Sequence, residues 1–162
     1  MVISQGAQAN LNGKVFENMM IPLFQANGFK VFSQTELKKI KTSNISRYVI
    51  RNAPYTTIYE EVGRTEFLIV DEDRRIRVEA KYQASQGSVD EKYPYMLLNG
   101  IYAYPEKEII FVIDGGGYKP GALKWLKKSI EGNWLDFKQN GKDIKLMNIA
   151  EFINWFNHEF SN

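Results

Sequence analysis

The chain has 162 residues, a formal net charge of +2, no cysteine and a single histidine, His158. This length fits one domain with a full hydrophobic core, and no apolar run approaches the roughly 20 residues that a membrane span needs. The absence of cysteine excludes disulfides and thiolate zinc sites, and one histidine cannot by itself build a Ser-His-Asp triad or a histidine-based zinc site. The chain also begins without the basic flank and apolar stretch of a secretory signal, so we expect a cytoplasmic protein whose reactive groups are carboxylates and lysines.

The first predicted element is an amphipathic helix over residues 13–28. Its apolar side chains recur at helical spacing and form one stripe: Val15, Phe16, Met19, Met20, Leu23 and Phe24. Asn27 and Gly28 provide a C-terminal stop. Glu17 is the only acidic residue in this stretch. A short strand over residues 29–32 is expected to follow.

The next segment is strongly basic. Residues 37–51 contain five basic side chains and no acid. Such a stretch would supply contacts to nucleic-acid phosphates, and the interleaved Asn44, Tyr48, Asn52 and Tyr55 could reach base edges. The alternative is a solvated loop or edge strand. Residues 47–51 predict an additional strand, which Ala53 and Pro54 are expected to break.

The segment 65–81 predicts two short strands joined by a charged turn near residues 72 and 73. Side chains alternate across a strand, so Glu79 and Lys81 project from the same face. A turn at that position sets Glu66 opposite Glu79. Two carboxylates so near each other repel, and keeping both ionised costs free energy unless a cation lies between them. The pattern therefore indicates a divalent-metal site with a lysine beside it.

The rest of the chain alternates helices and strands. A polar loop, residues 83–88, is followed by a helix over residues 89–104, with Ser88 and Glu91 as its capping box. Residues 108–114 form a continuous apolar run, which is typical of a strand buried on both faces. The remaining elements are a glycine-rich loop at 115–121, a helix at 122–130, a strand at 144–147 and a terminal helix at 149–158. His158 falls in that last helix, where a structural role is expected.

Glu66, Glu79-Ala80-Lys81 and the order helix, strand, hairpin, helix, strand resemble the PD-(D/E)XK nuclease superfamily. The resemblance implies an α/β fold with a restriction endonuclease-like αβββαβ core, a mixed central sheet flanked by helices. Thr65-Glu66 stands where Pro-Asp is usual in that family. Glutamate is one methylene longer but has the same charge and ligand chemistry. Asp71 is the alternative first acid, but it lies at the turn and cannot reach the level of Glu79, so Glu66 is preferred.

The resemblance also implies roles for individual residues. Glu66, Glu79 and the carbonyl of Ala80 would bind Mg²⁺, for which Mn²⁺ is expected to substitute. Lys81 would orient or deprotonate the attacking water and offset charge in the transition state. Glu17 would hold a second metal or an outer-shell water; the alternative is an exposed helix-face charge. Gln83 and Lys92 would lie near the scissile phosphate.

The expected function is that of a Mg²⁺-dependent DNA endonuclease, most simply a small type II restriction endonuclease or restriction-enzyme subunit. A Holliday junction resolvase-like or repair nuclease is one alternative, and a non-catalytic DNA-binding module of the same fold is another. The chain would form a single domain over residues 1–162, with a DNA-contacting insertion at 34–64. The residues expected to contact DNA are Lys38, Lys39, Lys41, Asn44, Arg47, Arg51, Asn52, Gln83 and Lys92. By analogy, we expect the chain to form a homodimer or to act with a partner restriction subunit. We expect no contact with a membrane.

Overall fold

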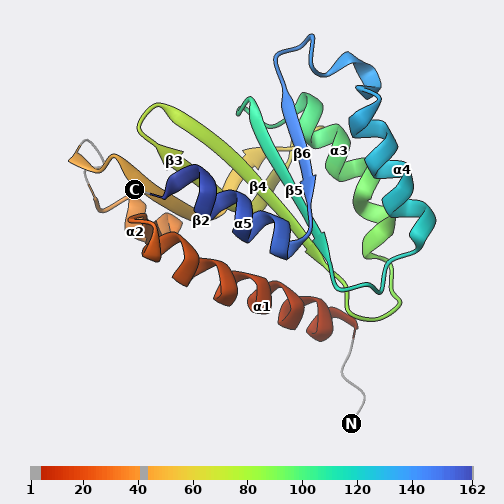
Figure 1. Cartoon of the computed structure of the whole chain (residues 1–162), viewed down its shortest axis with the longest axis horizontal. Coiled ribbons are helices and arrows are strands. Elements are labelled where there is room, and N and C mark those ends of the chain that lie inside the picture. The colour runs from red at the N-terminus through yellow and green to blue at the C-terminus, as the bar shows by residue number, and fades with distance from the viewer. Residues whose placement is uncertain (1–4, 41–43, 162) are drawn as a thin grey trace.

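The computed structural model describes residues 5–40 and 44–161 of the chain. It contains one six-stranded mixed sheet with strand order β1-β2-β3-β4-β5-β6 and helices on both faces (Figure 1). This architecture confirms the predicted α/β fold. The elements are α1 (Gln5–Ala26), β1 (Lys30–Phe32), α2 (Gln34–Leu37), β2 (Arg47–Thr56), β3 (Val62–Asp71), β4 (Arg74–Tyr82), η2 (Val89–Lys92), α3 (Tyr93–Tyr102), β5 (Glu108–Asp114), α4 (Pro120–Glu131), η3 (Trp134–Asp136), β6 (Asp143–Met147) and α5 (Ile149–Phe160).

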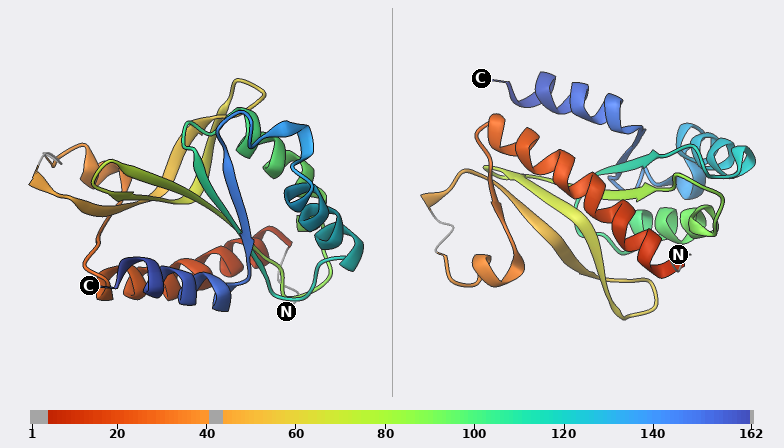
Figure 2. Two further views of the ribbon diagram at one scale, coloured as in Figure 1. Left: turned by 45° about the horizontal axis from the view of Figure 1, so that its top comes forward. Right: turned by 90° about the horizontal axis from the view of Figure 1, so that it is seen from below.

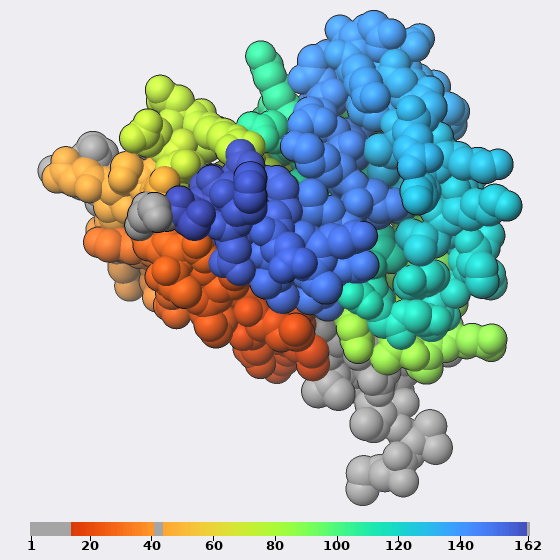
Figure 3. Space-filling model, in the orientation of Figure 1, coloured from red at the N-terminus to blue at the C-terminus, as the bar shows by residue number. Residues whose placement is uncertain are grey.

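One face of the sheet is covered by α1 and α5, which lie side by side in all views (Figures 1, 2 and 3). Their core is rich in phenylalanine because both helices present apolar stripes to the same strands. The Phe24 ring, for example, meets Phe67 of β3 at 5.0 Å and Phe156 of α5 at 5.0 Å between centroids. Phe16 and Met20 are also buried, as the predicted stripe requires, whereas Val15 and Met19 at its edge stay exposed.

The opposite face is covered by α3 and α4, which form a second core with the other side chains of β5. Ile109, Phe111 and Ile113 of β5 belong to this core, and Ile110 and Val112 belong to the first one. The alternation confirms that residues 108–114 are a strand buried on both faces. The described part of the chain contains no helix long and apolar enough to cross a membrane.

The predicted break at Ala53 and Pro54 is wrong, because β2 continues through both residues to Thr56. Pairing between β1 and β2 stops at Ile50, whereas pairing between β2 and β3 continues past Pro54. Beyond Ile50, β2 therefore has one open edge. A proline, which has no N–H to donate, is tolerated in a strand when its nitrogen faces such an edge.

The predicted capping box at Ser88 is also wrong. Ser88 makes no side-chain cap hydrogen bond, and the chain first forms the 3₁₀ turn η2 before α3 begins at Tyr93. Pro94 explains the later start of α3. Proline fits the first turn of a helix, but at an interior position it would remove a backbone hydrogen bond and clash with the preceding turn. The helix expected over residues 89–104 is thus divided in two.

Strands β3 and β4 form the predicted hairpin but pair along only part of their length. The turn lies at Glu72 and Asp73, and pairing ends at Phe67 and Val78 although both strands continue past that pair. Farther along, β3 pairs only with β2 and β4 only with β5, so the two strands diverge. Figure 2 shows the β2–β3 loop lying away from the end of β4. We call the gap the wedge; its walls are Thr65 and Glu66 of β3 and Glu79, Ala80 and Lys81 of β4.

Candidate active site

The side chain of Glu66 bridges the wedge. Its Oε2 accepts a hydrogen bond of 2.7 Å from the backbone N–H of Ala80. That N–H would be paired with β3 if the ladder continued, so the carboxylate takes the place of a missing strand partner. The contact confirms the predicted register and fixes Glu66 at the level of Glu79.

Glu79 and Lys81 project from the same face of β4, as the strand alternation predicts. Lys81 Nζ forms an ion pair with Glu79 Oε1 and donates a hydrogen bond of 3.2 Å to the Ala80 carbonyl. The Lys81 side chain remains 21 % exposed, whereas that of Glu79 is 9 % exposed. The lysine can therefore reach a substrate at the surface while the carboxylate lies beneath it.

The Glu79 carboxylate is held in an unfavourable setting for a negative charge. Burial, followed by the nearby charge of Glu66, raises the pKa of Glu79 to about 7 despite the attraction of Lys81. Its Oε2 atom is buried and has no hydrogen-bond partner. A buried charged oxygen left without a partner costs more than the ~1–3 kcal/mol of a neutral one. Among the described residues, no side chain or backbone group satisfies this second oxygen.

Lys81 stays charged in this environment. Burial acts to lower the pKa of Lys81, but the negative charges of Glu79 and Glu66 outweigh it and raise the pKa above the ordinary value. The amine is therefore an ammonium at neutral pH. It can orient a water molecule or stabilise negative charge, but it is poorly suited to accept a proton.

The donor set fits a hard divalent cation. Two carboxylates and a carbonyl oxygen are ligands of the type that Mg²⁺ and Mn²⁺ prefer. Among the described residues no group of three or more histidine, aspartate or glutamate side chains forms a cation site. The unpartnered oxygen of Glu79 and its raised pKa are both explained if a cation supplies the missing charge. Glu66, Glu79 and the Ala80 carbonyl therefore suit the metal that the sequence predicts.

Glu17 is placed elsewhere. Its Oε1 accepts a 3.1 Å hydrogen bond from Arg51 Nη1, and the pair is partly exposed. The register partner of Arg51 is Phe67, which packs against α1. Glu79, in contrast, neighbours Phe111, which packs with α3 and α4 on the opposite face of the sheet. No contact of Glu17 in the structure supports its expected role at the metal.

Seven of the nine predicted DNA-contacting residues lie in the segment 34–64 and fall into three groups. Lys38, Lys39, Asn44 and Asn52 are exposed, and Lys41 lies outside the described residues. Arg47 and Arg51 are partly exposed and engaged in ion pairs with Asp71, at 2.9 Å, and Glu17. Asn52 has a left-handed backbone (φ 50°) and lies between Arg51 and Ala53, whose register partners Phe67 and Thr65 flank Glu66. Within this set, Asn52 is therefore the residue level with Glu66 along the β2–β3 register.

Lys92 is exposed at the end of η2, but Gln83 is buried. The Gln83 amide donates a 3.0 Å hydrogen bond to the Gly117 carbonyl, and its Oε1 atom has no partner. The backbones also meet: the N–H of Gly117 donates to Gln83 O at 2.7 Å. A Cβ at Gly115 would lie 2.4 Å from Gln83 O, and one at Gly117 would lie 2.4 Å from Ser85 O. We call this contact the glycine seam; it anchors the end of β4 just after Lys81.

Asp90 and Tyr93 are two buried residues with polar groups that the sequence pattern does not single out. Asp90 accepts a 3.0 Å hydrogen bond from the N–H of Lys119, but its Oδ1 atom has no partner, and neither does the hydroxyl of Tyr93. Burial and then Asp90 raise the pKa of Tyr93 to about 12, against the opposing effect of Lys81. Buried polar atoms without partners are rare in folded proteins. The sequence gives no sign of this, since both residues fall within the helix that it predicts over residues 89–104.

Arg77 and Glu106 are the other residues that the sequence did not single out. Arg77 lies in the charged stretch of β4, but it is 2 % exposed and paired with the buried Glu106. Alternation correctly put Arg77 on the face of Glu79. It could not show that Tyr55 and Tyr104 cover this face, with the guanidinium 5.6 and 5.5 Å from their rings.

Comparison with known proteins supports the family expected from the sequence. The family model of the PD-(D/E)XK nuclease superfamily domain matches residues 8–160. Searches of curated proteins and of solved structures returned no match. The matched region contains every described strand of the sheet together with Glu66, Glu79 and Lys81. The chain belongs to the PD-(D/E)XK nuclease superfamily.

Proposed function

We propose that this protein is a Mg²⁺-dependent DNA endonuclease that hydrolyses phosphodiester bonds. The observation that carries the proposal is the convergence of Glu66, Glu79 and Lys81 at the wedge, where one buried Glu79 oxygen has no partner. Glu66, Glu79 and the Ala80 carbonyl would hold the cation. When bound, a divalent cation supplies a Lewis acid for the scissile phosphate and lowers the pKa of a coordinated water.

Lys81 contributes charge and orientation. Its raised pKa keeps it as an ammonium, so it would orient the attacking water and offset the charge that develops on the phosphate oxygens. Its partly exposed Nζ is linked to Glu79 and the Ala80 carbonyl, which fixes it beside the cation ligands. Because Lys81 is already protonated, it would not accept the proton of the attacking water.

The nucleic-acid surface would extend from the wedge to α2. Leu37 of α2 packs against a core cluster formed by Tyr48, Ile50, Ala53, Leu68 and Val70. Leu68 and Val70 lie two and four residues after Glu66 in β3, so all three positions share one face of the strand. Helix α2 therefore lies on the face of the sheet that includes the position of Glu66. The exposed Lys38 and Lys39 directly follow α2 and would contact phosphates. Asn52, level with Glu66 along the β2–β3 register, would be available for base recognition.

We infer sequence-specific cleavage of the restriction type, by a homodimer or with a partner restriction subunit. The segment at 34–64 provides exposed amides beside lysines, which suits groove recognition better than a purely electrostatic surface. A resolvase needs mainly a basic surface shaped to branched DNA, and the net charge of +2 is low for that. Cutting both strands of a duplex favours a symmetric assembly.

The test compares four substrates: supercoiled plasmid, a mixed-sequence linear duplex, single-stranded DNA and a four-way junction. Each is incubated with wild-type protein in Mg²⁺ and in a chelator, and with Glu79→Gln as the matched inactive control. We expect discrete fragments of the duplex that share one terminal sequence, only in Mg²⁺ and only with the wild-type protein.

An intact duplex beside a cleaved junction would favour the resolvase-like function. A featureless smear would point to a non-specific or repair nuclease. DNA binding without cleavage under any condition would replace the enzyme with a DNA-binding module of the same fold.

A further inference from the structure

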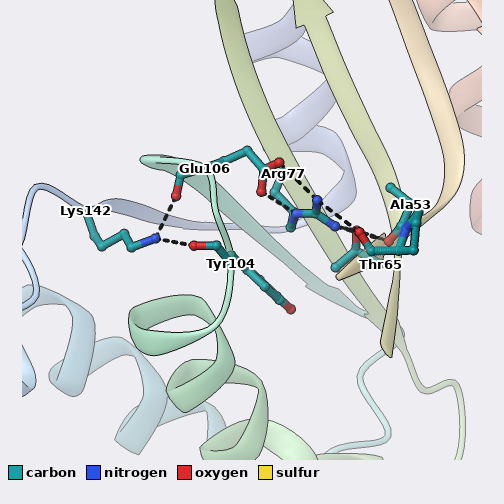
Figure 4. A network of polar contacts seen from close by, with 7 residues as sticks. Ala53, Thr65, Arg77, Tyr104, Glu106 and Lys142 are labelled. Carbon is teal, nitrogen blue, oxygen red and sulfur yellow. Dashed lines mark hydrogen bonds and ion pairs between the residues drawn. The ribbon is translucent and has the colours of Figure 1, made fainter. Parts of the chain in front are cut away.

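Arg77 is a buried charge that the proposed chemistry does not use. It lies two residues before Glu79, so both side chains start from the same face of β4. Its guanidinium forms a two-pronged pair with Glu106, with 3.0 Å between Nη2 and Oε1 and 2.5 Å between Nε and Oε2 (Figure 4). Charge-assisted bidentate pairs of this kind hold an arginine in one orientation.

The remaining donors of Arg77 reach across to the opposite strands. Nη1 donates to the Ala53 carbonyl at 3.1 Å and to Thr65 Oγ1 at 3.0 Å (Figure 4). Ala53 and Thr65 are register partners in β2 and β3, and Thr65 immediately precedes Glu66. One side chain of β4 is therefore bonded to the other wall of the wedge, where the β3–β4 ladder has ended.

Glu106 is itself anchored. It lies in the connection between α3 and β5, and Lys142 Nζ donates to the carbonyls of Tyr104 and Glu106 (Figure 4). The side chain of Glu106 is 6 % exposed and that of Arg77 is 2 % exposed. A buried ion pair of this kind contributes little net stability compared with apolar side chains of the same volume. Packing alone does not explain why charged groups occupy this position.

We propose that Arg77, oriented by Glu106, is a positioning residue that sets the width of the wedge and thereby the separation of the Glu66 and Glu79 carboxylates. The inference rests on the proposed function, since it assigns these carboxylates to a metal. Arg77 belongs to β4, the strand of one wall, and acts through its hydrogen bond to Thr65 of the other wall; it touches neither the cation nor the substrate. Loss of an outer partner of this kind typically costs about 10- to 100-fold in metal affinity.

The experiment measures Mn²⁺ binding to DNA-free protein by isothermal titration calorimetry and by the electron paramagnetic resonance spectrum of the bound ion. Arg77→Lys keeps the charge but cannot bond Glu106, Ala53 and Thr65 together. The double variant Arg77→Met with Glu106→Leu replaces the pair by apolar groups. We expect both to lose about 10- to 100-fold in Mn²⁺ affinity at temperatures well below their unfolding transitions, with an altered spectrum.

Arg74→Lys is the matched control. Arg74 lies on the same strand, at the turn end, and also forms a two-pronged pair with a glutamate, Glu108, at 2.7 Å. This variant should lower the melting temperature without changing Mn²⁺ affinity. If it weakens Mn²⁺ binding as much as Arg77→Lys does, general loosening of the sheet is sufficient and the inference is overturned.

Two further outcomes separate the inference from the proposed function. Wild-type Mn²⁺ affinity and spectrum in both Arg77 variants would overturn the positioning role and leave the nuclease proposal standing. A wild-type protein that binds no Mn²⁺ would overturn both. If the Arg77 variants do not fold, Thr65→Val removes only one acceptor; a several-fold loss of affinity then supports the inference, and no loss overturns it.

Discussion

The two ends of β4 carry the same ratio of charges but use them differently. At the turn end, Arg74 bridges Glu108 at 2.7 Å and Glu159 at 2.5 Å, and all three side chains are about one-third exposed. At the wedge, Lys81 faces Glu79 and Glu66, but Glu79 is buried and one of its oxygens has no partner.

The difference shows that burial, more than the count of charges, separates an ion-pair network from an incomplete site. The hydrogen bonds of Glu108 outweigh burial and raise the pKa of Arg74, so the turn end is a satisfied network. Burial and then the charge of Glu66 raise the pKa of Glu79 to about 7, and one of its oxygens has no partner. The same inventory of side chains is structural at one end and receptive to a cation at the other.

The largest expected effect comes from removing the wedge ammonium. Lys81→Ala should lower cleavage by at least about 100- to 1000-fold, because the transition state loses a preorganised positive group. Folding and DNA binding should change little, since Lys81 is not a metal ligand. Single-turnover cleavage assays beside circular dichroism and DNA-binding titrations check this. Arg74→Ala, at the other end, should lower stability and leave the cleavage step unchanged. Undiminished cleavage by Lys81→Ala would contradict the assignment of Lys81 to the cleavage site.

The second prediction separates the two candidate first acids. Glu66→Gln should weaken Mn²⁺ binding by about 10-fold or more, since it removes one of two charged ligands. Asp71→Asn should not, because Asp71 lies at the turn end and pairs with Arg47. Calorimetric titration of both variants gives the answer. An Asp71→Asn protein that fails to bind metal, with Glu66→Gln unaffected, would reverse the choice of ligand.

The third prediction concerns pH and metal-free stability. The folded-state pKa of Glu79, about 7, lies above its ordinary value of 4.5, so the folded protein binds this proton more tightly than the unfolded chain does. The contribution of this group is fully present below pH 4.5 and is lost as the pH rises through about 7. The melting temperature in a chelator should therefore fall over this range by several degrees more than that of Glu79→Gln. Mg²⁺ at pH 8 should restore it.

Calorimetric scans at several pH values provide the measurement. A melting temperature that rises between pH 5 and pH 8 in the chelator, for the wild type relative to Glu79→Gln, would contradict the buried setting of this carboxyl group.

The smallest expected effect lies in the salt dependence of DNA binding. Replacing Lys38 or Lys39 by alanine should lower the slope of log affinity against log salt by about one unit. Arg47→Ala and Arg51→Ala should change it less, because these side chains already engage Asp71 and Glu17. Lys145→Ala, which removes a charge outside this segment, is the control. Slopes that match the wild type for all four variants would return residues 37–51 to the solvated-loop hypothesis.

Much of the fold could be predicted because its signals are local and periodic. The apolar run at 108–114 and the charged turn at 72 and 73 specify β5 and the β3–β4 hairpin directly. The turn also fixes the register that brings Glu66 to Glu79, which the Ala80 contact confirms.

Other features depend on neighbours that are distant in the sequence. Pro54 is tolerated within β2 only because β1 is short and leaves that edge open. The burial of Arg77 depends on Glu106, 29 residues away, and on two tyrosine rings from separate elements. The pairing of Glu17 with Arg51 likewise requires knowing which face α1 covers. None of these follows from alternation or helical spacing.

The glycine seam has a consequence for mutational scans. Gly115 and Gly117 have no functional group, yet a single added methyl at either would collide with the backbone of the segment that follows Lys81. A screen for loss of activity should therefore return these glycines together with Glu79 and Lys81. Intolerance to substitution at the end of β5 would then report the space between two backbones, and chemistry could be assigned to the wrong strand if sensitivity alone were the guide.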